Sequence, residues 1–421
     1  MDYAIPLFEY IRNLESEAHI SVLYCSVSRF RILREGKFYN NFFTKHNISQ
    51  FDLSNQLDFP FRFFGNLIRM LLRRSERDNF TSENSTSFYY RKITDKISAL
   101  TGKLEKVVNK HTNIGKLLQK LNPDIVLFDN TSFTNFSGRS VLFEYLNAKK
   151  VKTVLLPHAP HHSDTNAFTP FDEKGEALPS YCEFWMPFKY DVTWNALPQK
   201  KEQFFYIGYP GLDSKWLSQI SKKKESRHIQ NRQKINCLLI VRKFVPKKGI
   251  KEVDFMYDYD EFIDLIGTIC RSVYEYRDDI NFIIKPHPSN DYKETEFVFS
   301  KTDLRNWSIS YEPVYDLLHK IDFVISLYST TLLIPAMLGI PTILINSSIQ
   351  EFVHKEESMR LMYTGLPFFV KDEFELTNSV KTVISQLKKG IGKKDDNNHE
   401  AAHLRDFFPD YASERAYKRL F

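Results

Sequence analysis

Two stretches decide how this sequence folds: Lys285-Pro286-His287-Pro288 and, further along, Ser326-Leu327-Tyr328-Ser329-Thr330-Thr331. Each directly follows a short apolar run, at residues 281–284 and 322–325 respectively. Apolar runs of this length, separated by segments with helical spacing, predict the buried strands of a parallel sheet. Because open parallel sheets bind ligands at the carboxyl ends of their strands, we expect both polar stretches at a binding edge.

The alternation of strands and helices extends through the second half of the chain. Strands are predicted at 235–241, 280–284, 307–310, 321–325 and 341–345, and helices near 259–276, 313–320, 330–338 and 373–388. The same rhythm occurs earlier, with strands at 124–128 and 151–156 on either side of a helix at 139–147. This order predicts an α/β protein with two Rossmann-like domains, each built on a parallel sheet.

The length of the chain also favours two domains, because 421 residues exceed what one hydrophobic core usually serves. The predicted division is an N-terminal domain at 1–207, a turn and linker at 208–234, a C-terminal domain at 235–395, and a final helix at 396–421. We expect that helix to pack back on the first domain. Residues 28–90 show too little periodicity to be placed.

The charge of the chain favours an anionic partner. It carries 58 Lys and Arg against 52 Asp and Glu, a net charge of +6. Nucleotide phosphates, an acidic glycan or the inner face of a membrane would each suit that excess. The basic residues are scattered and no nucleic-acid-binding signature is present, so nucleic acid is not an expected partner.

Cysteine usage and hydropathy indicate the compartment. Cys25, Cys182, Cys237 and Cys270 lie far apart with no C-x-x-C spacing, which favours unpaired thiols in a reducing compartment. The start of the chain lacks the basic flank and apolar core of a signal peptide, and no run approaches ~20 apolar residues. We therefore expect a cytoplasmic protein.

Aromatic and basic residues alternate at 59–64 and 68–74. A stretch of this kind has two interpretations. It can lie on the inner face of the cytoplasmic membrane, with its basic residues toward anionic lipid. It can equally be a helix packed on the first domain, which is the interpretation we prefer.

The order of motifs in the second half resembles the GT-B superfamily of glycosyltransferases. The residues that carry the resemblance are the His-Pro pair, Asp322, Ser329-Thr330-Thr331, Ala336, Gly339 and Pro341. In addition, Gly208-Tyr209-Pro210-Gly211-Leu212-Asp213 resembles the turn that joins the two domains in many members. The resemblance covers about residues 205–345 and extends to the first half only through its strand–helix rhythm.

Within the superfamily, the pattern is similar to transferases that use cytidine-linked donors. These are the sialyl- and polysialyltransferases, the Kdo transferases, and the CDP-alditol phosphotransferases of teichoic acid synthesis. Many UDP-sugar transferases carry a Glu in the helix after the hydroxyl cluster, where this chain reads Leu332-Leu333-Ile334-Pro335. The same stretch lacks the acidic motif of the nonhydrolysing sugar 2-epimerases, which share the fold.

The resemblance implies a donor site on the second domain. His287 is held between two prolines that fix the backbone, so it suits contact with the donor phosphates, although it can also be a plain structural turn. Three consecutive hydroxyl residues exceed what one helix cap needs, and Arg242 is suited to bidentate phosphate binding. The predicted donor-binding residues are Arg242, Lys243, Lys285, His287, Pro288, Ser326, Ser329, Thr330 and Thr331.

Two residues of the first domain are candidates for catalysis. His158 follows the strand at 151–156, and Asp129 ends the strand before it. Either can act as a general base, and a carboxylate can also be the nucleophile of a retaining mechanism. The alternatives are an acceptor contact for His158 and a helix cap for Asp129. The neighbouring His161 and His162 show no zinc-ligand spacing, so we expect neither a metal nor a cofactor.

These features together predict a metal-independent glycosyltransferase. The expected reaction moves a sugar from a nucleotide donor, CMP-linked Kdo or another nonulosonic acid, onto a glycan or glycolipid acceptor of a bacterial capsule or lipopolysaccharide. A CDP-alditol phosphotransferase and a catalytically inactive scaffold of polysaccharide assembly remain the alternatives.

Overall fold

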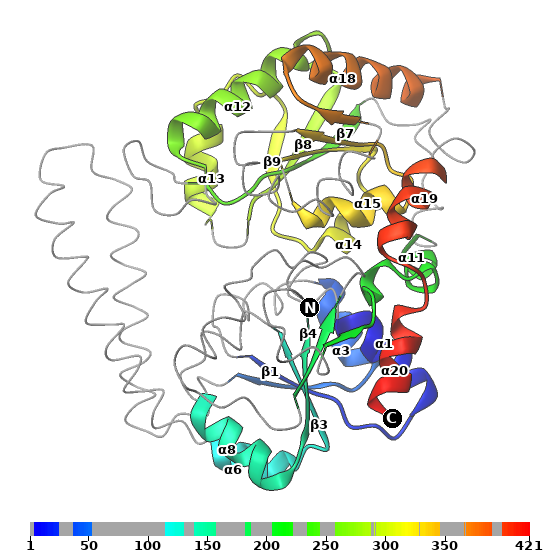
Figure 1. Ribbon diagram of the computed structural model, residues 1–421. Helices are drawn as coiled ribbons and strands as arrows, with labels where there is room; N and C mark the ends of the chain where they lie inside the picture. Colours follow the sequence, from blue (N-terminus) through cyan, green and yellow to red (C-terminus); the bar gives the residue numbers. More distant parts are fainter. Residues whose placement is uncertain are drawn as a thin grey trace, which may run out of the picture.

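The computed structural model of the protein describes residues 4–24, 37–52, 114–129, 139–156, 182–186, 204–221, 234–244, 257–287, 290, 292–327, 329–345, 366, 368–389 and 398–421. These residues form two α/β bodies, one above the other in Figure 1, and a pair of C-terminal helices that runs alongside both.

The second body is built on a six-stranded sheet in which every pairing is parallel. Its strands are β7 (Ile235–Ile240), β8 (Ile280–Lys285), β9 (Trp307–Ile309), β10 (Phe323–Leu327), β11 (Thr342–Ile345) and β12 (Phe368–Val370). Their order in the sheet is β12-β11-β10-β7-β8-β9, so the first strand of the unit lies in the middle and later strands add on both sides. This is the strand order of a Rossmann domain.

Alternate residues of these strands enter two different apolar clusters, because successive side chains of a strand point to opposite faces. Leu239 and Ile325 belong to a cluster with α12 (Tyr259–Ser272), α13 (Tyr292–Phe299) and α18 (Glu373–Lys388). On the other face, Leu238 and Val324 belong to a cluster with α14 (Val314–Leu317) and α15 (Leu333–Met337). The sheet is therefore covered on both faces, which explains its continuous apolar strands.

Local sequence signals fix the ends of the longer helices. Asp258 and Glu261 form a capping box at the start of α12, with the Glu261 N–H donating to Asp258 at 2.8 Å. Asp372 caps α18 in the same way by accepting from the Glu375 N–H at 2.8 Å. The helix predicted at 373–388 is confirmed with the bounds Glu373–Lys388.

The first body contains a four-stranded parallel sheet in the order β3-β4-β5-β6. Its strands are β3 (Ile125–Asp129), β4 (Lys152–Leu156), β5 (Cys182–Met186) and β6 (Phe204–Tyr206), with α6 (Ile114–Leu121) and α8 (Arg139–Lys149) packed on each other beside it. A separate parallel pair joins β1 (Ser21–Tyr24) to β2 (Ser49–Asp52). The helices α1 (Ala4–Leu14) and α3 (Lys37–Lys45) complete the described part.

The two bodies share one apolar cluster. It runs from α1 and α3 through α11 (Ser214–Ser221) to α14 and α15 of the second body. At its centre the rings of Trp216 and Tyr315 meet edge to face, with centroids 5.9 Å apart and an interplanar angle of 84°. Aromatic pairs in this arrangement contribute about 0.5–1.5 kcal/mol beyond the area they bury. The packing between the bodies is thus part of the core.

The prediction of a single C-terminal helix is wrong. The structure has α19 (Asn398–Phe407) and α20 (Ala412–Leu420), separated by Pro409, Asp410 and Tyr411. Proline has no backbone N–H to donate to a continuing helix, and Tyr411 adopts the left-handed conformation with φ of 66°. As a result α19 packs on α15 of the second body, and only α20 packs on α1 of the first.

The predicted strand at 321–325 is displaced by two residues from β10. The register with β7 starts at Phe323 opposite Cys237, and the preceding Asp322 accepts the Asn236 N–H through its Oδ2 at 2.8 Å. Ser326, which was expected to follow the strand, consequently lies inside it.

Two sequence-based expectations can be compared with the described residues. None of the described helices combines the length and apolar character that a membrane crossing needs. Cys182, Cys237 and Cys270 are buried as free thiols, and burial raises the pKa of Cys237 well above its usual value and that of Cys270 to about 11. Thiols of this kind are poor nucleophiles.

Candidate functional site

The topology of the six-stranded sheet gathers most of the predicted donor residues at one edge. β7 and β10 are neighbours, but β8 pairs with the far side of β7 and β11 with the far side of β10. The chain therefore leaves β7 and β10 in opposite directions, which makes the carboxyl ends of these two strands the place where such sheets bind ligands. Arg242 and Lys243 follow β7, His287 follows β8, and Ser329 follows β10.

His287 lies at this edge with an exposed side chain, whereas Pro286 beside it is buried. The carbonyl of His287 accepts the Asn290 N–H at 2.9 Å, so the backbone is held at this point. A fixed backbone with an exposed imidazole suits contact with a ligand. Pro288 and the Tyr328 that precedes the hydroxyl cluster lie outside the described residues.

Lys285 is the last residue of β8 and is half-buried. Its Nζ donates to the carbonyl of Glu312 at 2.8 Å, and the Glu312 carboxylate pairs with Lys320 at 2.5 Å. The ammonium group of Lys285 therefore ties the end of β8 to the chain segment after β9. The sequence predicts a donor contact for Lys285, and in the structure its ammonium group is anchored to the Glu312 carbonyl.

The hydroxyl cluster divides into a cap and two further groups. Ser329 is the cap, since its Oγ accepts the Thr331 N–H at 3.3 Å at the start of the turn η7 (Thr330–Leu332), which leads into α15. Thr330 and Thr331 are half-buried at the same place. Ser326 is fully buried and donates to the Leu327 carbonyl at 3.3 Å, so its hydroxyl serves the strand. The prediction that Ser326 follows the strand and faces a ligand is not supported.

The motif residues Asp322 and Gly339 have architectural positions. Asp322 lies at the opposite, amino edge of the sheet, where it accepts the Asn236 N–H. Gly339 ends α15 with φ of 67°, a conformation that glycine adopts without strain.

The two catalytic candidates belong to neighbouring strands of the first body. Asp129 is the last residue of β3, and its register partner Leu156 is the last residue of β4. His158 comes two positions after Leu156 in the sequence and lies outside the described residues. The strands are thus confirmed, while the roles of both residues stay predictions.

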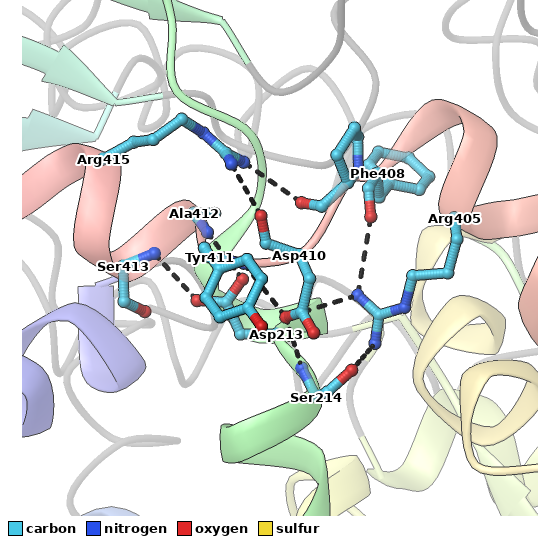
Figure 2. Close-up of polar contacts among 10 residues, drawn as sticks. Asp213, Ser214, Arg405, Phe408, Asp410, Tyr411, Ala412, Ser413 and Arg415 are labelled. Carbon is cyan, nitrogen blue, oxygen red and sulfur yellow. Dashed lines mark hydrogen bonds and ion pairs between the residues drawn. The ribbon is translucent and has the colours of Figure 1, made fainter.

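The Gly208–Asp213 turn is clasped by the segment between α19 and α20 (Figure 2). Asp213 accepts the N–H groups of Ala412 at 2.7 Å and Ser413 at 2.8 Å, which begin α20. In return Asp410 accepts the N–H of Ser214, which begins α11, at 2.8 Å. Each carboxylate therefore caps the helix that follows the other, an arrangement that both helix dipoles favour.

Arg415 completes this clasp. Its guanidinium donates to the carbonyls of Ile207 at 2.8 Å, Asp410 at 2.6 Å and Pro409 at 3.1 Å. Gly208 has φ of 92°, so any other residue would be strained there, and a Cβ placed on it would lie 2.6 Å from Arg415 Nη2 and displace that side chain. Burial raises the pKa of Asp213, and the hydrogen bonds from Ser413 and Ala412 oppose that rise.

One residue of the site region was not found from the sequence. Asn290 is buried beside the His-Pro motif and contacts the loops after both β7 and β8. The signal that could have found it is an amide side chain two residues after the Lys285-Pro286-His287-Pro288 motif. In the described parts of the chain, no three His, Cys, Asp or Glu residues come together as a metal site would require.

Comparison with known proteins gives information about the fold. No protein-family model matches the chain, and no curated protein sequence does. Solved structures do: a putative UDP-N-acetylglucosamine 2-epimerase from Listeria monocytogenes gives a TM-score of 0.51 at 12% identity, over 99% of this chain and 91% of that chain. A second UDP-N-acetylglucosamine 2-epimerase gives 0.51 at 13% identity, over 100% and 91%.

The chain has the GT-B fold. The predicted pair of Rossmann-like domains with parallel sheets is therefore confirmed, and the likeness extends over nearly the whole chain. At these identities it establishes the fold alone. In GT-B terms the four-stranded and six-stranded sheets are the centres of the N-terminal and C-terminal domains, and the clasped turn lies between them.

Proposed function

We propose that the protein is a glycosyltransferase that takes a sugar from a nucleotide donor bound at the carboxyl edge of the six-stranded sheet. One observation carries this proposal: the sheet topology brings Arg242, Lys243 and His287 together with Thr330 and Thr331 around the ends of β7, β8 and β10. Basic and hydroxyl side chains at that edge are what a diphosphate or phosphate leaving group needs.

The chemistry of the step explains why these side chains matter. Breaking the bond between sugar and nucleotide leaves negative charge on the phosphate oxygen. Fixed donors aimed at that oxygen stabilise the charge as it develops, which is commonly the largest single contribution to such catalysis. In this proposal His287, Thr330 and Thr331 supply the donors, with Arg242 and Lys243 adding positive charge and Lys285 holding the edge in place.

The first domain supplies the acceptor side of the reaction in this proposal. A base is needed to take the proton of the attacking hydroxyl, and His158 and Asp129 follow or end neighbouring strands. We place the acceptor domain at 1–207, the connection at 208–234, the donor domain at 235–395 and the C-terminal crossover at 396–421. The acceptor would be a glycan or glycolipid of a bacterial capsule or lipopolysaccharide.

The nucleotide we favour is cytidine-linked, with Kdo or another nonulosonic acid as the sugar. The reason is the helix after the hydroxyl cluster. Every residue of α15 is buried and apolar, from Leu333 to Met337, so the helix lacks the Glu that many UDP-sugar transferases carry there. The same absence speaks against a 2-epimerase, although both matched structures are named as such.

A donor screen with purified protein tests the proposal. CMP-, CDP-, UDP- and GDP-linked sugars would be offered with a glycan acceptor, and the product examined for a transferred sugar, for phosphorus and for epimerised donor. We expect release of CMP with transfer of the sugar. Phosphorus in the product would indicate the CDP-alditol phosphotransferase, an epimerised UDP-sugar would indicate the epimerase, and failure to bind any nucleotide would indicate a scaffold.

A further inference from the structure

The loop after β7 and the loop after β8 are joined by one side chain, that of Asn290. Its Nδ2 donates to the Phe244 carbonyl at 2.9 Å, and its Oδ1 accepts the Phe244 N–H at 3.4 Å. The side-chain amide thus pairs with both backbone groups of Phe244, as the backbone of an adjacent strand would. A contact of this kind fixes orientation as well as distance.

The backbone of Asn290 is held equally well. Its N–H donates to the His287 carbonyl at 2.9 Å, and its own carbonyl accepts the Tyr311 hydroxyl at 2.8 Å. Asn290 is only 3% exposed, so these bonds are made away from water. Displacing a buried amide whose groups are all bonded costs about 1–3 kcal/mol for each group left unsatisfied. Asn290 is therefore a rigid brace between Phe244 and His287.

The residues on either side of this brace are those that the proposed function uses. Phe244 directly follows Arg242 and Lys243, and the Lys243 carbonyl accepts the Tyr257 N–H at 3.3 Å, so the short segment after β7 is held at both ends. His287 supplies the other attachment point. A phosphate contacted by both loops requires a fixed relative position of the loops, because a displacement of about 1 Å can lower a catalytic rate about 100-fold.

We infer that Asn290 is a positioning residue of the donor site, which sets Arg242 and Lys243 in register with His287 so that both loops reach the same phosphate group. The inference rests on the proposed function for the identity of the ligand, whereas the brace itself does not. Asn290 touches no reacting atom in this account and acts only through the two loops.

A matched control lies at the amino end of β7, opposite the end that Asn290 contacts. Asn236 is the second residue of β7, its Nδ2 donates to the Lys320 carbonyl at 2.6 Å, and its Oδ1 accepts from Asn281 at 3.2 Å. Asn290 and Asn236 are thus both amides that bridge segments of one sheet, but only Asn290 lies at the carboxyl edge. Replacing either with Ala removes a comparable set of hydrogen bonds.

The test compares Asn290→Ala with Asn236→Ala in the full-length chain, well below the melting temperature of each. Calorimetry with CMP, CDP and UDP measures affinity, and hydrogen–deuterium exchange measures protection of the Phe244 and Asn290 amides. We expect Asn290→Ala to weaken nucleotide binding at least tenfold and to speed exchange at both amides. Asn236→Ala should lower the melting temperature but leave affinity within twofold.

Each outcome decides one of the two proposals. If wild type binds nucleotide and Asn290→Ala binds it equally well, the positioning role is wrong and the proposed function stands. If wild type binds none of the three nucleotides, the proposed function fails. Faster exchange in Asn290→Ala would still establish the brace in that case, and unchanged exchange would show that there is no brace. Should Asn290→Ala not fold, Tyr311→Phe removes the hydroxyl that bonds the Asn290 carbonyl and also contacts Thr295 Oγ1 at 3.4 Å. This variant is expected to weaken binding about threefold, and unchanged affinity would overturn the inference.

Discussion

Each of the two edges of the six-stranded sheet contains an asparagine that bridges neighbouring segments, but the edges differ in the exposure of their other polar residues. At the amino edge, Asn236 and Asp322 hold β7 beside β10, and the side chains there bond to one another and to nearby backbone. At the carboxyl edge, Asn290 does the corresponding work, but His287 next to it is exposed. The polar groups of the amino edge complete the fold, whereas the carboxyl edge presents an exposed histidine where parallel sheets bind ligands.

This contrast teaches that a buried polar residue alone does not mark a site. Asp322 belongs to the motif on which the family resemblance was based, but its carboxylate is committed to the Asn236 N–H. His287 belongs to the same motif, but it lies exposed at the carboxyl edge of the sheet. The difference follows from the direction of the strands, because ligands of parallel sheets bind at carboxyl ends.

The largest effect is expected at the carboxyl edge of the other sheet. Replacing the catalytic base should reduce turnover about 100-fold or more, near 2.7 kcal/mol, so at least one of His158→Ala and Asp129→Asn should do so with saturating acceptor. We favour His158, since imidazole titrates near neutral pH. Asp129 becomes the better candidate if configuration at the sugar is retained. Should both variants keep more than about a tenth of the wild-type rate, the base lies elsewhere.

The next effect should fall on stability alone. Asp322→Ala leaves the Asn236 N–H without its acceptor at a half-buried position, which costs about 1–3 kcal/mol in the free energy of unfolding. Urea unfolding measures that loss, and nucleotide affinity measured below the transition should stay unchanged. Asp322→Asn, which keeps an acceptor oxygen, is the control and should lose less. A parallel fall in affinity would show that the two edges are not independent.

His287→Ala should give the opposite result. Because its side chain is exposed, the melting temperature should barely move, while turnover should fall at least tenfold, about 1.4 kcal/mol. His19, an exposed histidine between α1 and β1, provides the control, and His19→Ala should change neither quantity. Near-normal turnover in folded His287→Ala would remove this residue from the donor site.

The smallest effect is expected from chelation. If the donor side chains at the carboxyl edge neutralise the phosphates, treatment with EDTA should leave turnover unchanged within experimental error. The measurement is the rate before and after chelation, with magnesium and manganese added back separately. Complete loss of turnover that either ion restores would mean that a metal ion, and not His287 and its neighbours, neutralises the donor phosphates.

The sequence predicted the sheet better than the residues that close it. Buried parallel strands such as β7 consist of unbroken apolar runs, and α18 begins at a strong capping residue, so both can be recognised from the sequence alone. β12, of three residues, and β5, which contains Glu183, lack that signal and were missed. The break between α19 and α20 was missed although Pro409 marks it.

The candidate site was predictable only in part for a related reason. His287 and the hydroxyl cluster stand out because they follow apolar runs. Asn290 does not, because its importance depends on Phe244, which is far away in the sequence and adjacent only once β7 and β8 are paired. Ser326 was misplaced because β10 (Phe323–Leu327) lies two residues further along the chain than its hydropathy predicted.

The clasp around the Gly208–Asp213 turn has a consequence for how the protein is made. The partners that Asp213 requires, the first N–H groups of α20, are synthesised only after the entire six-stranded sheet. Domains generally fold as units while the chain is being made. Both sheets can therefore form before the turn between them has its caps. These caps are then the last part of the connection that the growing chain supplies.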